Sequence, residues 1–214
     1  IPAPAFDFAL SHTNDVISVN QGSSVTNTIT ATNAGLITGQ NGSISLWIKP
    51  QGLSPNITNV FDAPAAIADR GGYIGIHRAT IGGQDRIWAY NYDGNQDKVG
   101  VSYISGQWTH IAWVHNNGTL LLYKDGALAG TVPSGNTQSL DKILNVGSGF
   151  SATTFFNGQI DDIRMYDRAL TPGEVASIHD ATADPASPTM HWKFNEEAGT
   201  AVADSSGNNV GGTF

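Results

Sequence analysis

A strand-like stretch at residues 86–92, with the sequence Arg-Ile-Trp-Ala-Tyr-Asn-Tyr, carries aromatic and polar side chains suited to holding a sugar. Successive side chains of a strand point to opposite faces, so Trp88, Tyr90 and Tyr92 share one face. Aromatic rings offer flat apolar surfaces to a sugar, and Asp, Asn and Arg hydrogen-bond its hydroxyl groups. The same face is equally compatible with a packed sheet that a loop covers. The predicted glycan-binding residues are Tyr73, Trp88, Tyr90, Asn91, Tyr92 and Asp93.

The carboxylates do not show the spacing that glycan hydrolysis needs. Glycosidases place two carboxyl groups on either side of the bond that they cleave. Here Glu196 and Glu197 are adjacent, whereas Asp161 and Asp162 point to opposite faces of a regular strand. Cysteine is absent and no Gly-x-Ser-x-Gly turn presents a serine nucleophile. We therefore expect no enzymatic activity, and glycan hydrolysis is the weakest alternative.

The histidines show no metal-binding spacing such as His-x-x-x-His. His110 and His115 are five residues apart, so a regular strand places them on opposite faces. With Trp108 and Trp113 beside them, these histidines are expected to pack within a sheet rather than to bind zinc. The histidines are His12, His77, His110, His115, His179 and His191.

The overall charge excludes two classes of partner. The chain has a net charge of -8, which disfavours binding to nucleic acid or to an anionic membrane surface. No apolar run reaches the roughly 18 to 20 residues of a membrane helix, so we expect no membrane insertion. Asn41, Asn56 and Asn117 begin Asn-x-Ser/Thr glycosylation sequons in predicted turns or loops. Together these features favour an extracellular or cell-surface location.

The spacing of apolar runs predicts an all-β chain. Strand-like runs recur at a spacing of about 8 to 15 residues and are separated by turn signals such as Asp93-Gly94, Asn117-Gly118 and Asp125-Gly126, the pattern of an antiparallel sandwich. The predicted strands cover residues 15–19, 24–32, 43–48, 59–62, 73–78, 86–92, 108–115, 119–124, 128–131, 144–147 and 159–166.

One short helix is predicted directly after the last of these strands. Thr171 provides an N-cap oxygen, Pro172 occupies the first helical position and Glu174 completes a capping box. Val175 and Ile178 supply the apolar side of this helix.

Four motifs of the chain lie at residues 43–50, 106–115, 120–126 and 158–171, the last with the sequence Gly-Gln-Ile-Asp-Asp-Ile-Arg-Met-Tyr-Asp-Arg-Ala-Leu-Thr. The last motif is similar to the closing signature of the laminin-G-like, concanavalin-A-like jelly rolls. The other three are similar to earlier strands of that family, in the same order. The resemblance implies a two-sheet antiparallel jelly roll with a short helix after the last core strand. It leaves function open, because this fold hosts lectins, adhesins and hydrolases.

The resemblance also implies calcium at the edge of the sandwich, since relatives often hold it there with acidic side chains. The positions that match the family's ligands are Asn14, Asp15, Asp161 and Asp162. The family's preceding Asp-Gly reads Ser11-His12 here, so one usual oxygen ligand is absent. Alternatively, Asp15 and Asp162 only cap turns or pair with Arg164 and Arg168.

The C-terminal segment at residues 190–214 resembles the opening strand of the same family, which normally comes first. We therefore divide the chain into a sandwich at 1–182, a Pro-containing linker at 183–189 and this displaced strand segment. It begins a further repeat, or folds back beside residues 159–166 as a permuted first strand, or is donated to a neighbouring subunit. The residues expected to fill a neighbour's groove are Met190, Trp192, Phe194 and Val202.

Strand donation is the leading expectation. A missing edge strand leaves unpaired backbone groups that a complementary strand can cover, and an open head-to-tail contact produces a filament. The predicted function is thus a structural or adhesive surface protein whose partner is a second copy of itself. The alternative is a carbohydrate-binding module, with or without calcium, whose partners are surface glycans.

Overall fold

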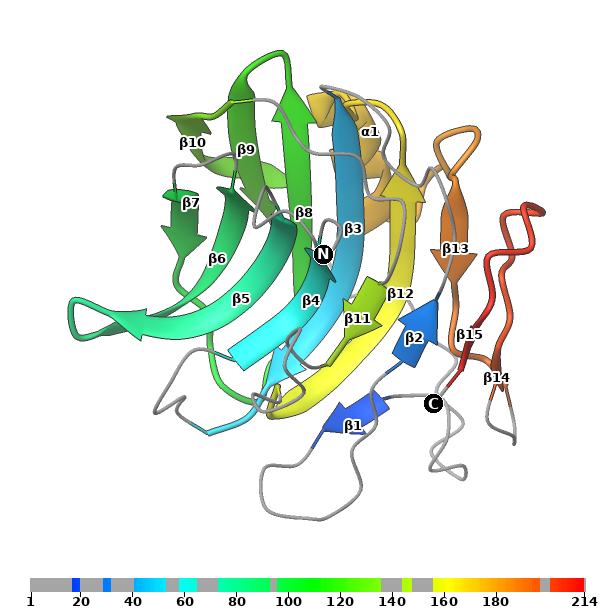
Figure 1. Cartoon of the computed structure of the whole chain (residues 1–214), viewed down its shortest axis with the longest axis horizontal. Helices are drawn as coiled ribbons and strands as arrows, with labels where there is room; N and C mark the ends of the chain where they lie inside the picture. The colour runs from blue at the N-terminus through cyan, green and yellow to red at the C-terminus, as the bar shows by residue number, and fades with distance from the viewer. Residues whose placement is uncertain are drawn as a thin grey trace.

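The computed structural model describes residues 17–19, 29–31, 41–52, 58–64, 73–92, 96–135, 144–147, 156–196 and 201–213. These residues form two antiparallel sheets and one short helix, which confirms the predicted fold class (Figure 1). The first sheet has the strand order β1-β12-β3-β8-β9-β10, with β13 also paired to β12. The second has the order β14-β15-β2-β11-β4-β5-β6-β7.

The strands of the first sheet are β1 (Ile17–Val19), β3 (Gly42–Pro50), β8 (Thr109–Asn116), β9 (Thr119–Lys124), β10 (Ala127–Pro133), β12 (Gly158–Tyr166) and β13 (Met190–Trp192). Those of the second are β2 (Ile29–Ala31), β4 (Thr58–Pro64), β5 (Tyr73–Ile81), β6 (Gln84–Tyr92), β7 (Gln96–Val101), β11 (Leu144–Val146), β14 (Ala201–Val202) and β15 (Gly212–Thr213). The helix α1 spans Pro172–His179.

The core lies between the two sheets, where alternate side chains of each strand meet. In β3 the inward residues Ile44, Leu46 and Ile48 are fully buried, as period-2 alternation requires. From the second sheet, Ile76 and Ile87 pack into the same cluster. None of the helical structure in the described ranges is long and apolar enough to cross a membrane.

Strand β7 was missed by the sequence prediction. It begins Gln-Asp-Lys, so its apolar alternation is carried only by Val99 and Val101. Because β7 is an edge strand of the second sheet, pairing with β6 supplies all of its backbone partners within that sheet. The pairing to β6, rather than its own sequence pattern, selects the extended conformation.

Strand β12 contains a bulge that the predicted regular alternation did not include. Asp161 pairs with Trp47 and Arg164 pairs with Ser45, so one extra residue is inserted between them. Asp162 takes a positive φ of 49°. The bulge changes the phase of the strand, and Ile160 and Ile163 can both face the core.

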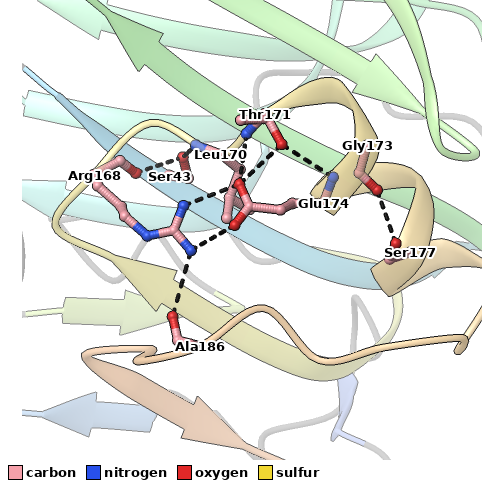
Figure 2. Close-up of polar contacts among 8 residues, drawn as sticks. All are labelled: Ser43, Arg168, Leu170, Thr171, Gly173, Glu174, Ser177 and Ala186. Atoms are coloured by element: carbon pink, nitrogen blue, oxygen red, sulfur yellow. Dashed lines mark hydrogen bonds and ion pairs between the residues drawn. The ribbon is translucent and has the colours of Figure 1, made fainter.

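Helix α1 forms as its capping signals predict. The Thr171 hydroxyl accepts from the backbone N–H of Glu174, whose carboxylate accepts from the Thr171 N–H (Figure 2). Arg168 adds two bonds to that carboxylate, of 2.7 and 3.0 Å. Val175 and Ile178 then pack on the outer face of the first sheet.

The turn before α1 is fastened to β3 by one hydroxyl group. Ser43 Oγ donates to the carbonyl of Arg168 and accepts from the N–H of Leu170, both at 2.9 Å (Figure 2). Ser43 is fully buried, so these bonds satisfy polar groups that water does not reach. The position of the helix on the sheet therefore follows from the path of β3.

The C-terminal segment completes the sandwich of its own chain. In β13, Met190 pairs with Met165 and Trp192 with Ile163, so β13 lies end to end with β1 along one edge of β12. Farther on, Thr213 of β15 pairs with Thr30 of β2. These contacts place the segment at the right of Figure 1, beside both sheets.

This arrangement matches the permuted alternative, and it does not show the expected donation of the strand to a neighbour. Met190, Trp192, Phe194 and Val202, the four residues expected to fill a neighbour's groove, are buried in the core of the same chain. The Trp192 indole N–H also donates to the carbonyl of Val210 at 2.7 Å. The position that a donated strand would need beside β12 is already occupied.

Candidate functional site

The outward surface of β5, β6 and β7 brings several aromatic side chains together. In β6 the inward residues Ile87 and Ala89 are buried in the core, so Trp88 and Tyr90 face away from it. Cross-strand pairing then forms two neighbouring rows, His77–Trp88–Gly100 and Gly75–Tyr90–Lys98. We call this surface the aromatic face, and it consists of Gly75, His77, Arg86, Trp88, Tyr90, Lys98 and Gly100.

The rings of the aromatic face lie flat against the sheet. The rings of His77 and Tyr90 stack with their centroids 5.2 Å apart and an interplanar angle of 21°. A Cβ at Gly75 would collide with Nε2 of His77, and a Cβ at Gly100 would lie 2.6 Å from Cε3 of Trp88. Both glycines are therefore required for the rings to lie directly on the backbone.

The indole of Trp88 is held in place by its polar edge. Its Nε1–H donates to the carbonyl of Ala79 at 3.1 Å. Trp88 remains half-buried, whereas Tyr90 is 7% exposed. Burial lowers the pKa of His77 to about 4, so its imidazole is neutral at pH 7. The described cationic groups of the face are thus Arg86 and Lys98.

The predicted glycan-binding residues do not all lie on this face. Trp88 and Tyr90 do, as alternation along the strand predicted. Tyr73 and Tyr92 occupy the ends of β5 and β6, where the structure describes their backbone alone, and Asp93 lies outside the described residues. Asn91 instead points inward and is fully buried, and its Nδ2 donates to Ser134 Oγ at 2.7 Å.

Sequence reasoning missed the residues that β5 and β7 contribute. His77, Lys98 and the two glycines lie far from Trp88 in the sequence, and only strand pairing brings them to it. Their alternation within β5 and β7 indicates which of their neighbours share a face. It does not indicate which strands pair or in which register.

Asp162, one of the predicted calcium ligands, is already bonded to two side chains. Its Oδ2 lies 2.7 Å from Nη1 of Arg164, and its Oδ1 lies 2.7 Å from Nε2 of His191. Burial acts to raise the pKa of Asp162, but the hydrogen bond from His191 and the charge of Arg164 outweigh it and lower the pKa. A calcium ion there would compete with the Arg164 guanidinium and the His191 ring for both carboxylate oxygens.

The other predicted calcium ligands give no complete site in the described structure. Asp161 Oδ1 accepts from the N–H of Asp162 at 2.8 Å, and Asn14 and Asp15 lie outside the described residues. Within the described ranges, no group of three or more His, Asp or Glu side chains is placed to hold a metal ion.

A serine–histidine pair on the outer face of the first sheet has hydrogen-bonding geometry but no access. Ser45 Oγ lies 2.8 Å from Nε2 of His110, and both residues are fully buried. Burial, followed by the charge of His179, lowers the pKa of His110 to about 3. A substrate cannot reach either atom, so this pair is part of the packing around Trp47 and His179.

Comparisons with known proteins agree with the jelly-roll architecture. The SAP-like pentraxin of Limulus polyphemus has a TM-score of 0.62 and 16% identity, covering 91% of this chain and 93% of that one. Domain 4 of AbnA, an extracellular arabinanase from Geobacillus stearothermophilus solved with arabinotriose, has a TM-score of 0.55 and 24% identity. That match covers 70% of this chain and 71% of the arabinanase domain. At these identities the two structures show the fold alone.

Sequence relatives match a shorter part of the chain. Human pentraxin-4 is 33% identical over 87 residues, which are 35% of this chain and 18% of that protein. Human neuronal pentraxin-1 is 32% identical over 85 residues, 34% of this chain and 20% of the relative. The chain thus spans less than a quarter of the length of either relative.

The family model described as the concanavalin A-like lectin/glucanases superfamily matches residues 21–176, well over half of the chain. This range includes all four motifs on which the resemblance depends. Together with the two antiparallel sheets, it shows that the chain belongs to the concanavalin A-like lectin/glucanase superfamily, as a laminin-G-like domain.

Proposed function

We propose that this chain is a non-catalytic carbohydrate-binding module that holds a saccharide on the aromatic face. The observation that carries the proposal is the alignment of Trp88 with the His77–Tyr90 stack on one outward surface. Rings fixed flat on a rigid sheet lose little conformational freedom when a ligand packs on them. A saccharide would lie with an apolar face against the half-buried ring of Trp88, which the more deeply buried His77–Tyr90 stack adjoins.

Two further points support the proposal. The superfamily to which the chain belongs is named after lectins and glucanases. The structure of the similar arabinanase domain was solved in complex with arabinotriose. In addition, Trp88 is only half-buried, so part of its ring is accessible to a ligand. A module of this kind acts where glycans are exposed, so we propose an extracellular or cell-surface location.

Calcium enters this proposal only through residues other than Asp162. If the family's ion is present, Asp161 with Asn14 and Asp15 would hold it, and it would supply a fixed positive charge to sugar hydroxyl groups. N-glycosylation of the chain itself is best supported at Asn117, which is exposed in the turn between β8 and β9. The Asn41 Oδ1, by contrast, already accepts from the Asn117 N–H at 2.8 Å.

Head-to-tail assembly through the C-terminal segment is not part of the proposal. To donate β13, a subunit would have to withdraw Trp192 and Phe194 from its own core. Each large aromatic side chain removed from a core costs about 3 to 5 kcal/mol, so the closed arrangement is favoured over the exchanged one until a neighbour replaces every contact.

Binding to a glycan array, followed by titration calorimetry with the best oligosaccharide, tests the proposed function. Trp88→Ala should abolish measurable binding while the protein keeps its circular dichroism spectrum. Leu128→Ala is the matched control, because Leu128 is 53% exposed on β10, outside the aromatic face. Equal affinity of wild type and Trp88→Ala, or an array without any bound saccharide, would contradict the proposal.

A further inference from the structure

The aromatic face carries two cations that have no carboxylate partner in the described structure. Arg86 lies two residues before Trp88 on the same side of β6, and Lys98 pairs with Tyr90 from β7. The Arg86 guanidinium donates one bond, from Nη1 to the carbonyl of Gly100 at 3.3 Å, which places it beside Trp88. Both basic side chains are half-buried.

The acidic residues next to these cations in the sequence face the other way. Asp85 points inward, where it binds Arg78 at 3.0 Å and accepts from the Tyr103 hydroxyl at 2.7 Å. Asp97 also points inward, and its Oδ2 accepts from the N–H of Gly135 at 3.3 Å. Alternation along β6 and β7 thus separates the acidic side chains from the basic ones.

This lack of an ion-pair partner distinguishes Arg86 from the other arginines in the described part of the chain. Arg78 is paired with Asp85, Arg164 with Asp162 and Asp184, and Arg168 with Glu174. No ion pair within 4.0 Å involves Arg86 or Lys98 among the described residues. In a chain of net charge -8, acidic groups are abundant, yet none of the described ones neutralises this face.

We infer that the aromatic face selects acidic saccharides and binds their carboxylate or sulfate group between Arg86 of β6 and Lys98 of β7. The inference rests on the proposed function, since it names the ligand class of the same site. A guanidinium forms paired hydrogen bonds with a carboxylate or a sulfate, and an ammonium adds a point charge. The half-buried ring of Trp88 would hold the sugar to which the acidic group belongs.

Titration calorimetry with matched probes tests this inference. The carboxylate pair is a galacturonate hexamer and its methyl ester, and the sulfate pair is a chondroitin sulfate hexasaccharide and its desulfated form. We expect wild type to bind each acidic probe about tenfold more tightly than its neutral or less charged counterpart at 50 mM salt, and this ratio to fall as salt rises.

Arg86→Gln and Lys98→Gln should each weaken binding of the acidic probe about three- to tenfold and weaken binding of the uncharged ester less. Lys193→Gln is the control, because Lys193 is exposed after β13 and outside the aromatic face. Melting temperatures should remain similar in all three variants, since neither cation of the face has an ion-pair partner to lose.

The outcomes separate the two proposals. Suppose that binding occurs and depends on Trp88. If charged and uncharged probes then bind equally, or if Lys193→Gln weakens binding as much as Lys98→Gln, the selection of acidic saccharides is wrong, whereas the carbohydrate site remains supported. If neither acidic nor neutral saccharides bind, both proposals fail. Preference for the galacturonate over the sulfated probe, or the reverse, identifies which acidic group the site takes.

Discussion

At the scale of single residues, the buried histidines determine how the protein responds to acid. Burial lowers the pKa of His77 to about 4, and burial together with the charge of His179 lowers that of His110 to about 3. Arg164 opposes protonation of His110 further, whereas Asp162 favours it. The unfolded chain, with ordinary histidines, therefore binds more protons than the folded chain below pH 6.5.

The free energy of unfolding should consequently fall as the pH falls from 6.5 towards 4. The contribution of a depressed histidine is fully present above pH 6.5, and each one adds up to about 1.4 kcal/mol per pH unit to the slope. His77→Phe keeps a ring over Gly75 but cannot titrate. It should therefore reduce the slope of the unfolding free energy against pH by up to about 1.4 kcal/mol per pH unit, which corresponds to one proton. Urea unfolding at several pH values from 4.5 to 7 measures this slope. Identical slopes for variant and wild type would contradict the lowered pKa of His77.

A second residue-scale prediction concerns Asp162, which bridges β12 and β13. Asp162→Asn leaves Arg164 and His191 without their carboxylate, and we expect a loss of about 2 kcal/mol in the free energy of unfolding. The loss should be the same in EDTA and in calcium chloride, because this carboxylate holds side chains rather than an ion. A loss seen only with calcium present would show that Asp162 is a calcium ligand after all.

At the scale of elements, the local chemistry of α1 is sufficient to define its start. The Thr171 cap and the Glu174 carboxylate satisfy backbone donors that the first helical turn leaves open. The hydrogen bonds from Arg168, then those from Thr171, lower the pKa of Glu174 to about 2 against the opposing effect of burial. This stabilisation is present above pH 4.5 and is lost as the pH falls towards 2.

Removing the cap should therefore have a measurable cost at neutral pH. We expect Thr171→Ala to lower the free energy of unfolding by about 1 kcal/mol. Ser177→Ala is a control in the same helix, since its hydroxyl only donates to the carbonyl of Gly173, and its effect should stay within about 0.5 kcal/mol. Chemical denaturation of both variants tests this, and an equal cost for the two would show that the cap is not important.

At the scale of the whole molecule, the C-terminal segment acts as part of the sandwich that precedes it. Its buried residues join the same core as β3 and β8, and β13 shares an edge of β12 with β1. The two ends of the chain thus contribute neighbouring strands to one sheet. The stability of the sandwich should therefore depend on residues of the C-terminal segment, which follows the sandwich strands and the linker in the sequence.

Trp192→Ala tests this dependence, with an expected loss of about 3 to 5 kcal/mol in the free energy of unfolding. Wild type should be monomeric by size exclusion with light scattering, and truncation before Met190 should leave an unstable or aggregated chain because the core is opened. Lys193→Ala, at an exposed position next to Trp192, should be close to neutral. Filaments of wild type together with a stable, monomeric truncated chain would restore the strand-donation model.

Short-range signals in the sequence determined the fold class and most elements of this protein. Alternating apolar residues predicted nearly all of the strands, and Thr171, Pro172 and Glu174 predicted the helix. These signals act between neighbours in the chain, so each can be recognised without knowing what packs against it. Trp88 and Tyr90 were assigned to one face by the same reasoning.

Only the tertiary structure decided the features that depend on pairing between distant strands. The rows that bring His77, Lys98 and Gly100 to Trp88 follow from register, and the bulge at Asp162 follows from the alignment of β12 with β3. Whether Trp192 completes its own sandwich or a neighbour's depends on how the linker turns back, and both arrangements bury the same apolar side chains. A sequence pattern specifies which surfaces must be covered, whereas the fold decides which segment covers them.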